Sequence, residues 1–197
     1  MTLQGRRVVV LGLGLTGLSV ARWASAQGAR VSVADTRAEP PCAEALRAEL
    51  SHIPVSTGPV TDATLSGAEL IVISPGLSHA LPAVRRALER GVEVVGDVEL
   101  FARALPSGQK VIAITGTNGK TTVTTLTTEL LGSAGLTAES VGNIGNPVLD
   151  ALAAHERTGD WPDVFVIELS SDRMEDAREV LARSYALVGS PLTVPED

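Results

Sequence analysis

The chain has 197 residues, with 16 Lys and Arg against 23 Asp and Glu, so its formal net charge is −7. A hydrophobic content of 44% with 20% charged residues is typical of a globular protein and excludes a disordered or collagen-like chain. The acidic balance argues against a nucleic-acid partner, which needs clustered Lys and Arg. Free nucleotides remain possible ligands, because backbone amides can bind phosphate without net positive charge.

Short β-branched runs alternate with helix-like segments along the whole chain. We predict strands at Val8–Leu11, Val31–Ala34, Leu70–Ile73, Val92–Val95, Val111–Thr115 and Val164–Leu169. We predict helices at Leu15–Ala26, Ala43–Leu50, Pro82–Arg90, Val98–Ala104, Thr121–Ser133 and Val148–Arg157. This alternation predicts an α/β fold with parallel sheets covered on both faces.

The stretch Leu105–Gln109 carries Pro106, Ser107 and Gly108 and precedes a new strand, loop and helix. It predicts a boundary between two domains, 1–105 and 106–197.

The first glycine loop matches the pattern G-x-G-x-x-G, with Gly12, Gly14 and Gly17 between a strand and a helix. Here Gly12 would permit a tight turn, Gly14 the close approach of a diphosphate, and Gly17 close helix packing. Asp35 ends the next strand, near the position of the ribose-binding acid in dinucleotide folds. By itself the loop indicates either an NAD-type site or a glycine turn needed only for packing.

The second glycine loop ends in Gly-Lys-Thr, as phosphate-binding loops do, and follows a predicted strand. Its predicted ATP-binding residues are Gly116, Thr117, Asn118, Gly119, Lys120, Thr121 and Thr122. The loop amides would surround phosphates, Lys120 would reach the β- and γ-phosphates, and the Thr121 hydroxyl would ligate Mg²⁺. The loop departs from the strict pattern at Ile114, and an amphipathic helix with Leu126, Leu130 and Ala134 follows it.

Two nucleotide sites in tandem suggest that ATP activates one substrate, while a second nucleotide is the group by which the protein binds a substrate. In this context the chain resembles the Mur ligases, the ATP-dependent ligases of peptidoglycan synthesis. The motifs that carry the resemblance are residues 115–122, Gly142-Asn143-Ile144-Gly145 and Ile167-Glu168-Leu169-Ser170-Ser171. Four N-terminal features, at 12–19, 34–37, 74–77 and 96–101, resemble the D-glutamate-adding branch of that family. The resemblance runs from about residue 5 to residue 171.

The resemblance implies a Rossmann-like N-terminal domain followed by part of a P-loop-type ATPase domain. It implies that UDP-N-acetylmuramoyl-L-alanine, D-glutamate and ATP react through an acyl phosphate, with Mg²⁺ as cofactor and ATP as co-substrate. The catalytic residues would be Lys120 and Glu168, with Thr121 and Glu168 on the metal. The UDP-sugar would be held by Gly14, Leu15, Thr16, Asp35, Thr36, Arg37, Ser74, Gly76 and Asn143. Full-length members would be monomers that bind neither membranes nor nucleic acid.

Each of these assignments has a plainer alternative. Asp35 could simply end a strand, Asn143 could be a turn residue, and Ser170 and Ser171 could cap a helix. Surface roles are predicted for His52, His79 and His155, a packing role for Cys42, and a solvated helix face for Arg85, Arg86 and Arg90.

Two alternatives remain for the chain as a whole: an NAD(P)-dependent oxidoreductase, or a non-catalytic nucleotide-binding fragment. After Ser171 the sequence departs from the family pattern, and no His follows His155 and no Lys follows Lys120. We therefore expect a truncated ligase that is inactive alone. Arg6, Arg7 and the following apolar run imitate a secretory signal, but the glycines fit a nucleotide loop better. The single cysteine, Cys42, fits a reducing cytoplasm.

Overall fold

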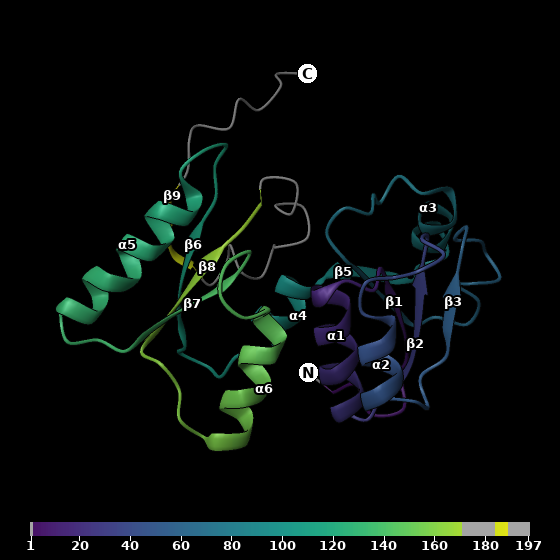
Figure 1. The fold of residues 1–197 in the computed structure, drawn as a ribbon, viewed down its shortest axis with the longest axis horizontal. Coiled ribbons are helices and arrows are strands. Elements are labelled where there is room, and N and C mark those ends of the chain that lie inside the picture. The colour runs from purple at the N-terminus through teal and green to yellow at the C-terminus, as the bar shows by residue number, and fades with distance from the viewer. Residues whose placement is uncertain (1, 171–183, 189–197) are drawn as a thin grey trace. The chain divides into compact units, whose positions relative to one another are not determined.

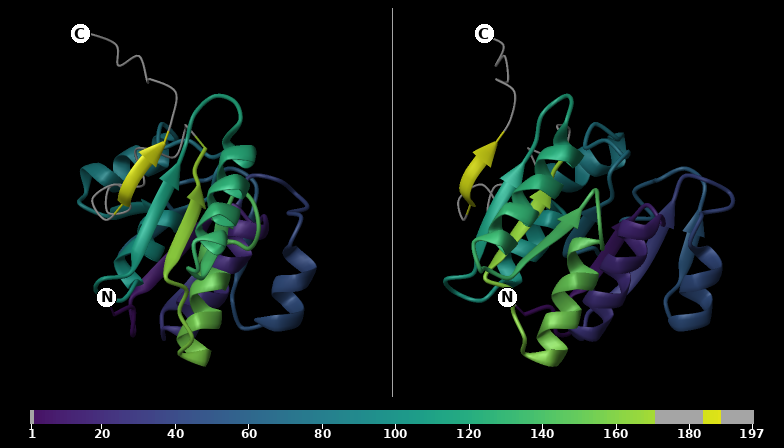
Figure 2. Two further views of the ribbon diagram at one scale, coloured as in Figure 1. Left: turned by 90° about the vertical axis from the view of Figure 1, so that its left-hand side faces the viewer. Right: turned by 60° about the vertical axis from the view of Figure 1, so that its left-hand side comes forward.

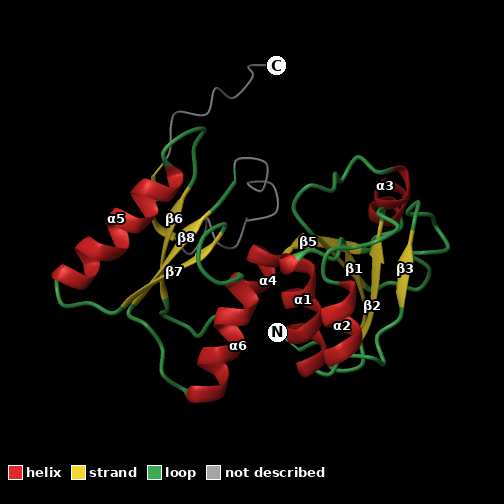
Figure 3. Ribbon diagram, in the orientation of Figure 1, coloured by secondary structure: helices red, strands yellow, loops and turns green. Residues whose placement is uncertain are grey.

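The computed structural model describes residues 2–170 and 184–188. Contacts within the chain divide it into two compact units, Met1–Leu100 and Phe101–Asp197. Helices and strands alternate along both of them (Figure 3). Each unit has one sheet in which every strand pairing is parallel. The predicted α/β class with parallel sheets is therefore confirmed.

Unit 1 has a five-stranded sheet with the order β3-β2-β1-β4-β5 (Figure 1). Its strands are β1 Arg7–Leu11, β2 Arg30–Asp35, β3 Val55–Thr57, β4 Leu70–Ile73 and β5 Glu93–Gly96. Its helices are α1 Leu15–Ala26, α2 Ala43–Glu49 and α3 Pro82–Glu89. The strand order reverses between β1 and β4, and this switch point is where open α/β sheets bind ligands.

The core of unit 1 comes from strands that are apolar on both faces. Val8, Val9, Val10 and Leu11 of β1 are all buried, as is every residue of β4. The β1 and β4 side chains at Val9, Leu11, Ile71 and Ile73 pack with Ala83, Val84 and Ala87 of α3. Helix α1 contacts β1 and β2. Cys42 is buried at the start of α2, which confirms its predicted packing role.

Unit 2 has a four-stranded sheet with the order β7-β8-β6-β9, whose strands run side by side in one direction (Figure 2). The strands are β6 Lys110–Ile114, β7 Ala138–Gly142, β8 Val164–Glu168 and β9 Ser184–Val188. The helices are α4 Asp97–Ala104, α5 Lys120–Ser133 and α6 Val148–Thr158. Helix α4 crosses the division between the units. Its Phe101 packs edge-on against Phe165 of β8, with ring centroids 5.2 Å apart. Phe101 is the first residue of unit 2, so this unit begins a few residues before the boundary predicted at Leu105–Gln109.

The predicted elements agree with the structure within one residue at each end, but three strands were missed. β3 has only three residues and is mostly exposed, and β7 reads Ala-Glu-Ser-Val-Gly, without an apolar run. β9 pairs with β6 by its backbone. Ser171, for which a helix cap was the plainer alternative, lies outside the described residues. None of the helices that the structure describes is long and apolar enough to cross a membrane.

One feature of α5 differs from its predicted amphipathic pattern. Leu126 and Leu130 are 53% and 60% exposed, and Ala134 is exposed just after the helix. The side chains that face the sheet are instead Val123 and Leu131, which pack against Ile114, Val164 and Val166. The helix was placed correctly, but the face that packs was not, because the pattern allows more than one apolar stripe.

Candidate functional site

The first glycine loop follows β1 and is tied to both neighbouring strands. The Gly12 amide donates to the Ala34 carbonyl on β2, at 2.7 Å, and the Ser74 hydroxyl after β4 donates to the Gly12 carbonyl, at 3.2 Å. Gly12 has φ of +92°, a conformation that favours glycine. The loop therefore lies at the switch point between β1 and β4.

Gly17 and Gly14 play different roles in this loop. A Cβ at Gly17 would lie 1.9 Å from the Gly12 carbonyl oxygen, so only glycine lets α1 pack this closely. A Cβ at Gly14 would meet no atom within 4 Å. The structure thus confirms the turn predicted at Gly12 and the close packing predicted at Gly17. The open space at Gly14 suits the approach of a ligand to the N-terminus of α1.

Asp35 at the end of β2 completes the loop with its carboxylate. One oxygen, Oδ2, accepts from the Leu13 amide at 2.7 Å and from the Arg37 guanidinium at 2.6 Å. The other, Oδ1, accepts from the Arg37 amide at 2.8 Å and from Arg37 Nε at 2.9 Å. The side-chain hydrogen bonds from Arg37 outweigh burial and lower the pKa of Asp35 to about 2. Asp35 is therefore an ionised residue that shapes the loop, and its contact with a ligand stays a prediction.

The predicted UDP-sugar residues of unit 1 gather at one edge of its sheet. They are Gly14, Leu15, Thr16, Asp35, Thr36, Arg37, Ser74 and Gly76, and all follow the carboxyl ends of β1, β2 or β4. Leu15 is 73% exposed although it is a large apolar residue, and Thr36 beside Arg37 is exposed as well. This edge therefore offers both an apolar side chain and open polar groups to a ligand.

The second glycine loop joins β6 to α5 in unit 2. Gly119, with φ of +76°, precedes the first residue of α5, and that helix has no side-chain N-cap. Its first amides are therefore available to an anion such as phosphate. Lys120 donates from Nζ to the Gly116 carbonyl at 2.7 Å, folded back on the loop. Thr121 and Thr122 are exposed at the start of the helix.

A buried carboxylate lies beside this loop. Glu168 ends β8 in register with Ile114 of β6, and its side chain is 4% exposed. Its Oε2 and the Thr115 hydroxyl are both buried and, among the described residues, have no hydrogen-bond partner. Unpaired buried carboxylate oxygens are rare. Sequence reasoning missed Thr115 as a site residue, although its place between a strand and a glycine is a usable signal.

A carboxylate oxygen such as Glu168 Oε2 suits a hard cation such as Mg²⁺, which prefers carboxylate and hydroxyl ligands and retains water. The described residues contain no group of three or more His, Cys, Asp or Glu side chains that could hold a metal by themselves. A cation at Glu168 would therefore depend on further oxygens from a phosphate or from water.

The loop between β7 and α6 lies directly against the end of β8. The Asn143 amide donates to the Glu168 carbonyl at 3.2 Å, and the Gly142 amide donates to the Asn146 carbonyl at 3.2 Å. A Cβ at Gly142, whose φ is +104°, would lie 2.6 Å from the Glu168 carbonyl oxygen. Asn143, assigned to the UDP-sugar by resemblance, thus belongs to unit 2 and neighbours Glu168.

The surface role predicted for His155 is wrong. Its side chain is 19% exposed, and Nε2 lies 2.5 Å from a carboxylate oxygen of Glu139 on β7. The ring also stacks on Trp161, with centroids 5.6 Å apart. Because β7 was not predicted, its Glu139 could not be recognised as a partner.

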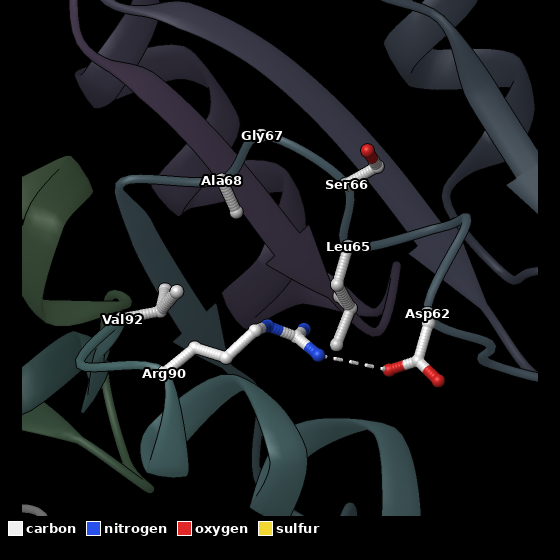
Figure 4. Close-up of a pocket in the computed structure, with 7 residues that line it drawn as sticks. All are labelled: Asp62, Leu65, Ser66, Gly67, Ala68, Arg90 and Val92. Carbon is white, nitrogen blue, oxygen red and sulfur yellow. Dashed lines mark hydrogen bonds and ion pairs between the residues drawn. The ribbon is translucent and has the colours of Figure 1, made fainter.

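Arg85 and Arg86 of α3 and Arg90 directly after it are exposed, which confirms the solvated face predicted for them. Arg86 pairs with Asp62 at 2.9 Å and Arg90 pairs with it at 3.4 Å, while both side chains stay half-exposed. A shallow hollow of about 270 Å³ lies beside this pair, at the amino ends of β4 and β5 (Figure 4). Its lining residues are Asp62, Leu65, Ser66, Gly67, Ala68, Arg90 and Val92. None of the predicted site residues lines it.

Comparisons with known proteins match both units. A family model described as Mur ligase MurD-like, N-terminal domain, matches residues 6–96. A second model, Mur ligase middle domain, matches residues 114–187. The chain belongs to the Mur ligase family.

Among relatives of this Mur ligase chain, the UDP-N-acetylmuramoylalanine–D-glutamate ligase of Methylobacillus flagellatus is 52% identical over 194 residues. The match covers 98% of this chain and 40% of the relative. The enzyme of the same name from Thiobacillus denitrificans is 48% identical, over 95% of this chain and 43% of the relative. The chain therefore spans about 40% of the length of the curated relatives that it matches.

A solved structure shares the fold of the Mur ligase chain. The UDP-N-acetylmuramate:L-alanyl-gamma-D-glutamyl-meso-diaminopimelate ligase from Neisseria meningitides superposes with a TM-score of 0.54 at 20% identity. The match covers 98% of this chain and 64% of that one.

The family match extends further than the motifs alone indicated. We expected the resemblance to end at Ser171, but the middle-domain model continues to residue 187. The missing aromatic and apolar signals after Ser171 are therefore a local divergence within a Mur ligase domain. Membership of this ligase family also favours the ligase interpretation over an NAD(P)-dependent oxidoreductase.

Proposed function

We propose that the chain supplies the nucleotide-handling part of an ATP-dependent ligase that adds D-glutamate to UDP-N-acetylmuramoyl-L-alanine. The observation that carries this proposal is the buried Glu168 oxygen beside a phosphate-binding type of loop, an oxygen that has no hydrogen-bond partner in the part of the chain that the structure describes. Hydride transfer to a nicotinamide requires neither a loop for the γ-phosphate nor a buried carboxylate beside it. The names of relatives that are 42–52% identical support the choice of substrate.

On the UDP-sugar side, the amides at the start of α1 would bind the diphosphate through the open space at Gly14. Exposed Leu15 would cover the uracil ring, with Thr16 and Thr36 donating or accepting hydrogen bonds. Arg37 would contact the nucleotide from its exposed side while its inner side holds Asp35. Ser74, Gly76 and Asn143 would line the path of the diphosphate and sugar.

On the ATP side, the amides of Gly116–Thr122 and the N-terminus of α5 would surround the phosphates. Lys120 would leave the Gly116 carbonyl and move to the β- and γ-phosphates. Thr121 and Glu168 would hold Mg²⁺, which would neutralise charge between the γ-phosphate and the acyl group. Lys120 and Glu168 are the residues that would contact the reacting groups.

The reaction that these residues would serve begins with a poor electrophile, a carboxylate. Its oxygen attacks the γ-phosphorus of ATP, ADP leaves, and the amine of D-glutamate then displaces phosphate from the acyl phosphate. For this reaction the protein must hold the carboxylate close to the γ-phosphate and neutralise the negative charge of both groups. We place this function in the cytoplasm, where ATP is present and Cys42 stays reduced.

Binding tests the proposal without requiring turnover. We expect Mg·ATP at a hundred times its dissociation constant to add about 2.7 kcal/mol to stability, a shift of about 5–11 °C in melting temperature. UDP-N-acetylmuramoyl-L-alanine should act similarly, and NADH should not.

The variant Lys120→Ala should weaken Mg·ATP binding by about 100-fold, since a charge-assisted contact to phosphate is lost. Lys110→Ala is the matched control, because Lys110 is the only other lysine and is exposed at the start of β6. A shift with NADH alone would contradict the proposal and revive the oxidoreductase. Ligation of D-glutamate by the purified chain would contradict the expectation that this chain is inactive alone.

A further inference from the structure

Both ring nitrogens of His155 face hydrogen-bond acceptors. Nε2 lies 2.5 Å from a carboxylate oxygen of Glu139 on β7, and Nδ1 contacts the Asp160 carbonyl after α6. A neutral imidazole has only one N–H, so it can donate to one of these acceptors. The imidazolium has two, and only this form satisfies both contacts.

The remaining surroundings of His155 are aromatic. Its ring stacks on Trp161 and meets Phe165 of β8 edge-on, with centroids 5.6 Å and 5.5 Å away. The charged groups that face it are Glu139 from β7 and Asp160 from the loop after α6. Burial lowers the pKa of His155, but the contacts to Glu139 and Asp160 outweigh burial and raise the pKa above its ordinary value.

The contact joins the two elements that flank the Asn143 loop. Glu139 is three residues before Gly142, where β7 ends, and His155 lies on α6, which begins at Val148. Between them the chain must keep Asn143 within 3.2 Å of the Glu168 carbonyl. At Gly145 the fit is as tight as at Gly142, since a Cβ there would lie 2.5 Å from the Ser140 carbonyl oxygen.

We propose that protonated His155 is a positioning residue that locks α6 to β7 and thereby holds the Gly142–Gly145 loop against the carboxyl end of β8. His155 acts through this loop and touches neither Asn143 nor Glu168 in any contact that the structure shows. Its importance for ligation rests on the proposed function, in which those two residues contact substrate and metal.

The contact makes the loop dependent on pH in a defined direction. Because the pKa of His155 is raised in the folded chain, its stabilisation is complete below the unfolded pKa of about 6.5. It is lost as the pH rises through the higher folded value. Loop order should therefore be greatest in mildly acidic solution and should decrease toward alkaline pH.

Amide hydrogen exchange followed by NMR tests this directly and needs no ligand. We would measure protection factors, corrected for intrinsic exchange, for the Asn143 and Gly142 amides from pH 5.5 to 8.5. Relative to core amides of β8, loop protection should fall by about 10-fold across this range, equivalent to 1.4 kcal/mol. In His155→Gln and Glu139→Gln, protection should be low throughout and independent of pH. His52→Gln, which changes an exposed histidine of unit 1, should behave as wild type.

Loop protection in wild type that does not change with pH, or protection in His155→Gln equal to wild type, would overturn the proposal. If a variant does not fold, the wild-type profile decides alone. Because no nucleotide is present, failure of this experiment leaves the proposed ligase function untouched. Equally, failure to bind ATP would leave the role of His155 in positioning the loop intact.

Discussion

Each of the two glycine loops of this chain joins a strand to a helix beside a buried carboxylate, but only one of these carboxylates has its oxygens paired. In the first, the carboxylate beside the loop is neutralised within the protein, because Arg37 and the Leu13 amide bind both oxygens of Asp35. In the second, the Glu168 carboxylate is equally buried, but its Oε2 has no partner among the described residues. Contacts within the described residues thus complete the first loop, whereas the second is the one at which we propose a cation.

The two loops should therefore respond differently to substitution. Changes at the first loop remove contacts that the folded chain already makes, so they should reduce stability. Changes at the second loop remove a group whose burial is costly, so they should affect ligand binding more than folding. Four substitutions, in order of decreasing change in stability, test this contrast between the loops.

The substitution Gly17→Ala should have the largest effect. Its Cβ would overlap the Gly12 carbonyl oxygen at 1.9 Å, so either α1 or the loop must move. We expect a loss of about 3 kcal/mol or more in the free energy of unfolding, measured by denaturant titration. The matched control is Gly14→Ala, whose Cβ meets nothing within 4 Å and should change stability little. Equal losses in the two variants would show that the loop does not depend on this packing.

The substitution Asp35→Asn should cost about 2 kcal/mol at pH 7, because the pKa of Asp35 is lowered from 3.8 to about 2 in the folded state. This stabilisation is present above the unfolded pKa and is lost as the pH falls through the folded one. The difference in the free energy of unfolding between wild type and variant should therefore decrease from pH 5 downward. Denaturant titrations at pH 7, 5 and 3.5 measure it. A difference that stays constant with pH would mean that the charge of Asp35 is not what stabilises the loop.

Without ligand, the substitution Glu168→Gln should change the free energy of unfolding in the opposite direction and stabilise the chain. Replacing a buried carboxylate whose Oε2 has no partner among the described residues should raise the free energy of unfolding by about 1 kcal/mol in metal-free buffer. With Mg·ATP, wild type should gain stability and the variant should gain much less. The control is Glu129→Gln on the exposed side of α5. Destabilisation in metal-free buffer would show that Glu168 already has a stabilising partner, and the contrast between the loops would fail.

The smallest effect concerns the helix that begins at the second loop. Leu130→Ala removes a side chain that is 60% exposed and should change stability by less than about 0.5 kcal/mol. Leu131→Ala, one residue further, removes a side chain that packs on the sheet and should cost more. Thermal unfolding of the two variants measures the difference. The reverse order would mean that the exposed stripe of α5, and not its packed face, stabilises the helix.

The sequence was enough to predict an element wherever residues adjacent in the chain determine its conformation. The strand at Leu70–Ile73 is apolar throughout, and the glycines at 12 and 17 signal a tight turn followed by a helix. Motif order was also enough to place Lys120 beside a phosphate-binding type of loop and Glu168 at a strand end. The short polar strand β7 carries no such signal, so it could not be predicted.

The sequence alone determined the parallel α/β class, both glycine loops and the family, because these depend on short patterns along the chain. Only the tertiary structure decided which groups are paired. It joined Arg37 to Asp35, brought Glu139 on an unpredicted strand to His155, and left Glu168 Oε2 buried without a hydrogen-bond partner among the described residues. It also turned Val123 and Leu131, and not Leu126, toward the sheet. Burial and the His155–Glu139 contact depend on which strands and helices become neighbours in the fold. Asp35 and Arg37 are only two residues apart, but which contact their side chains make is a matter of conformation, and the sequence does not state it.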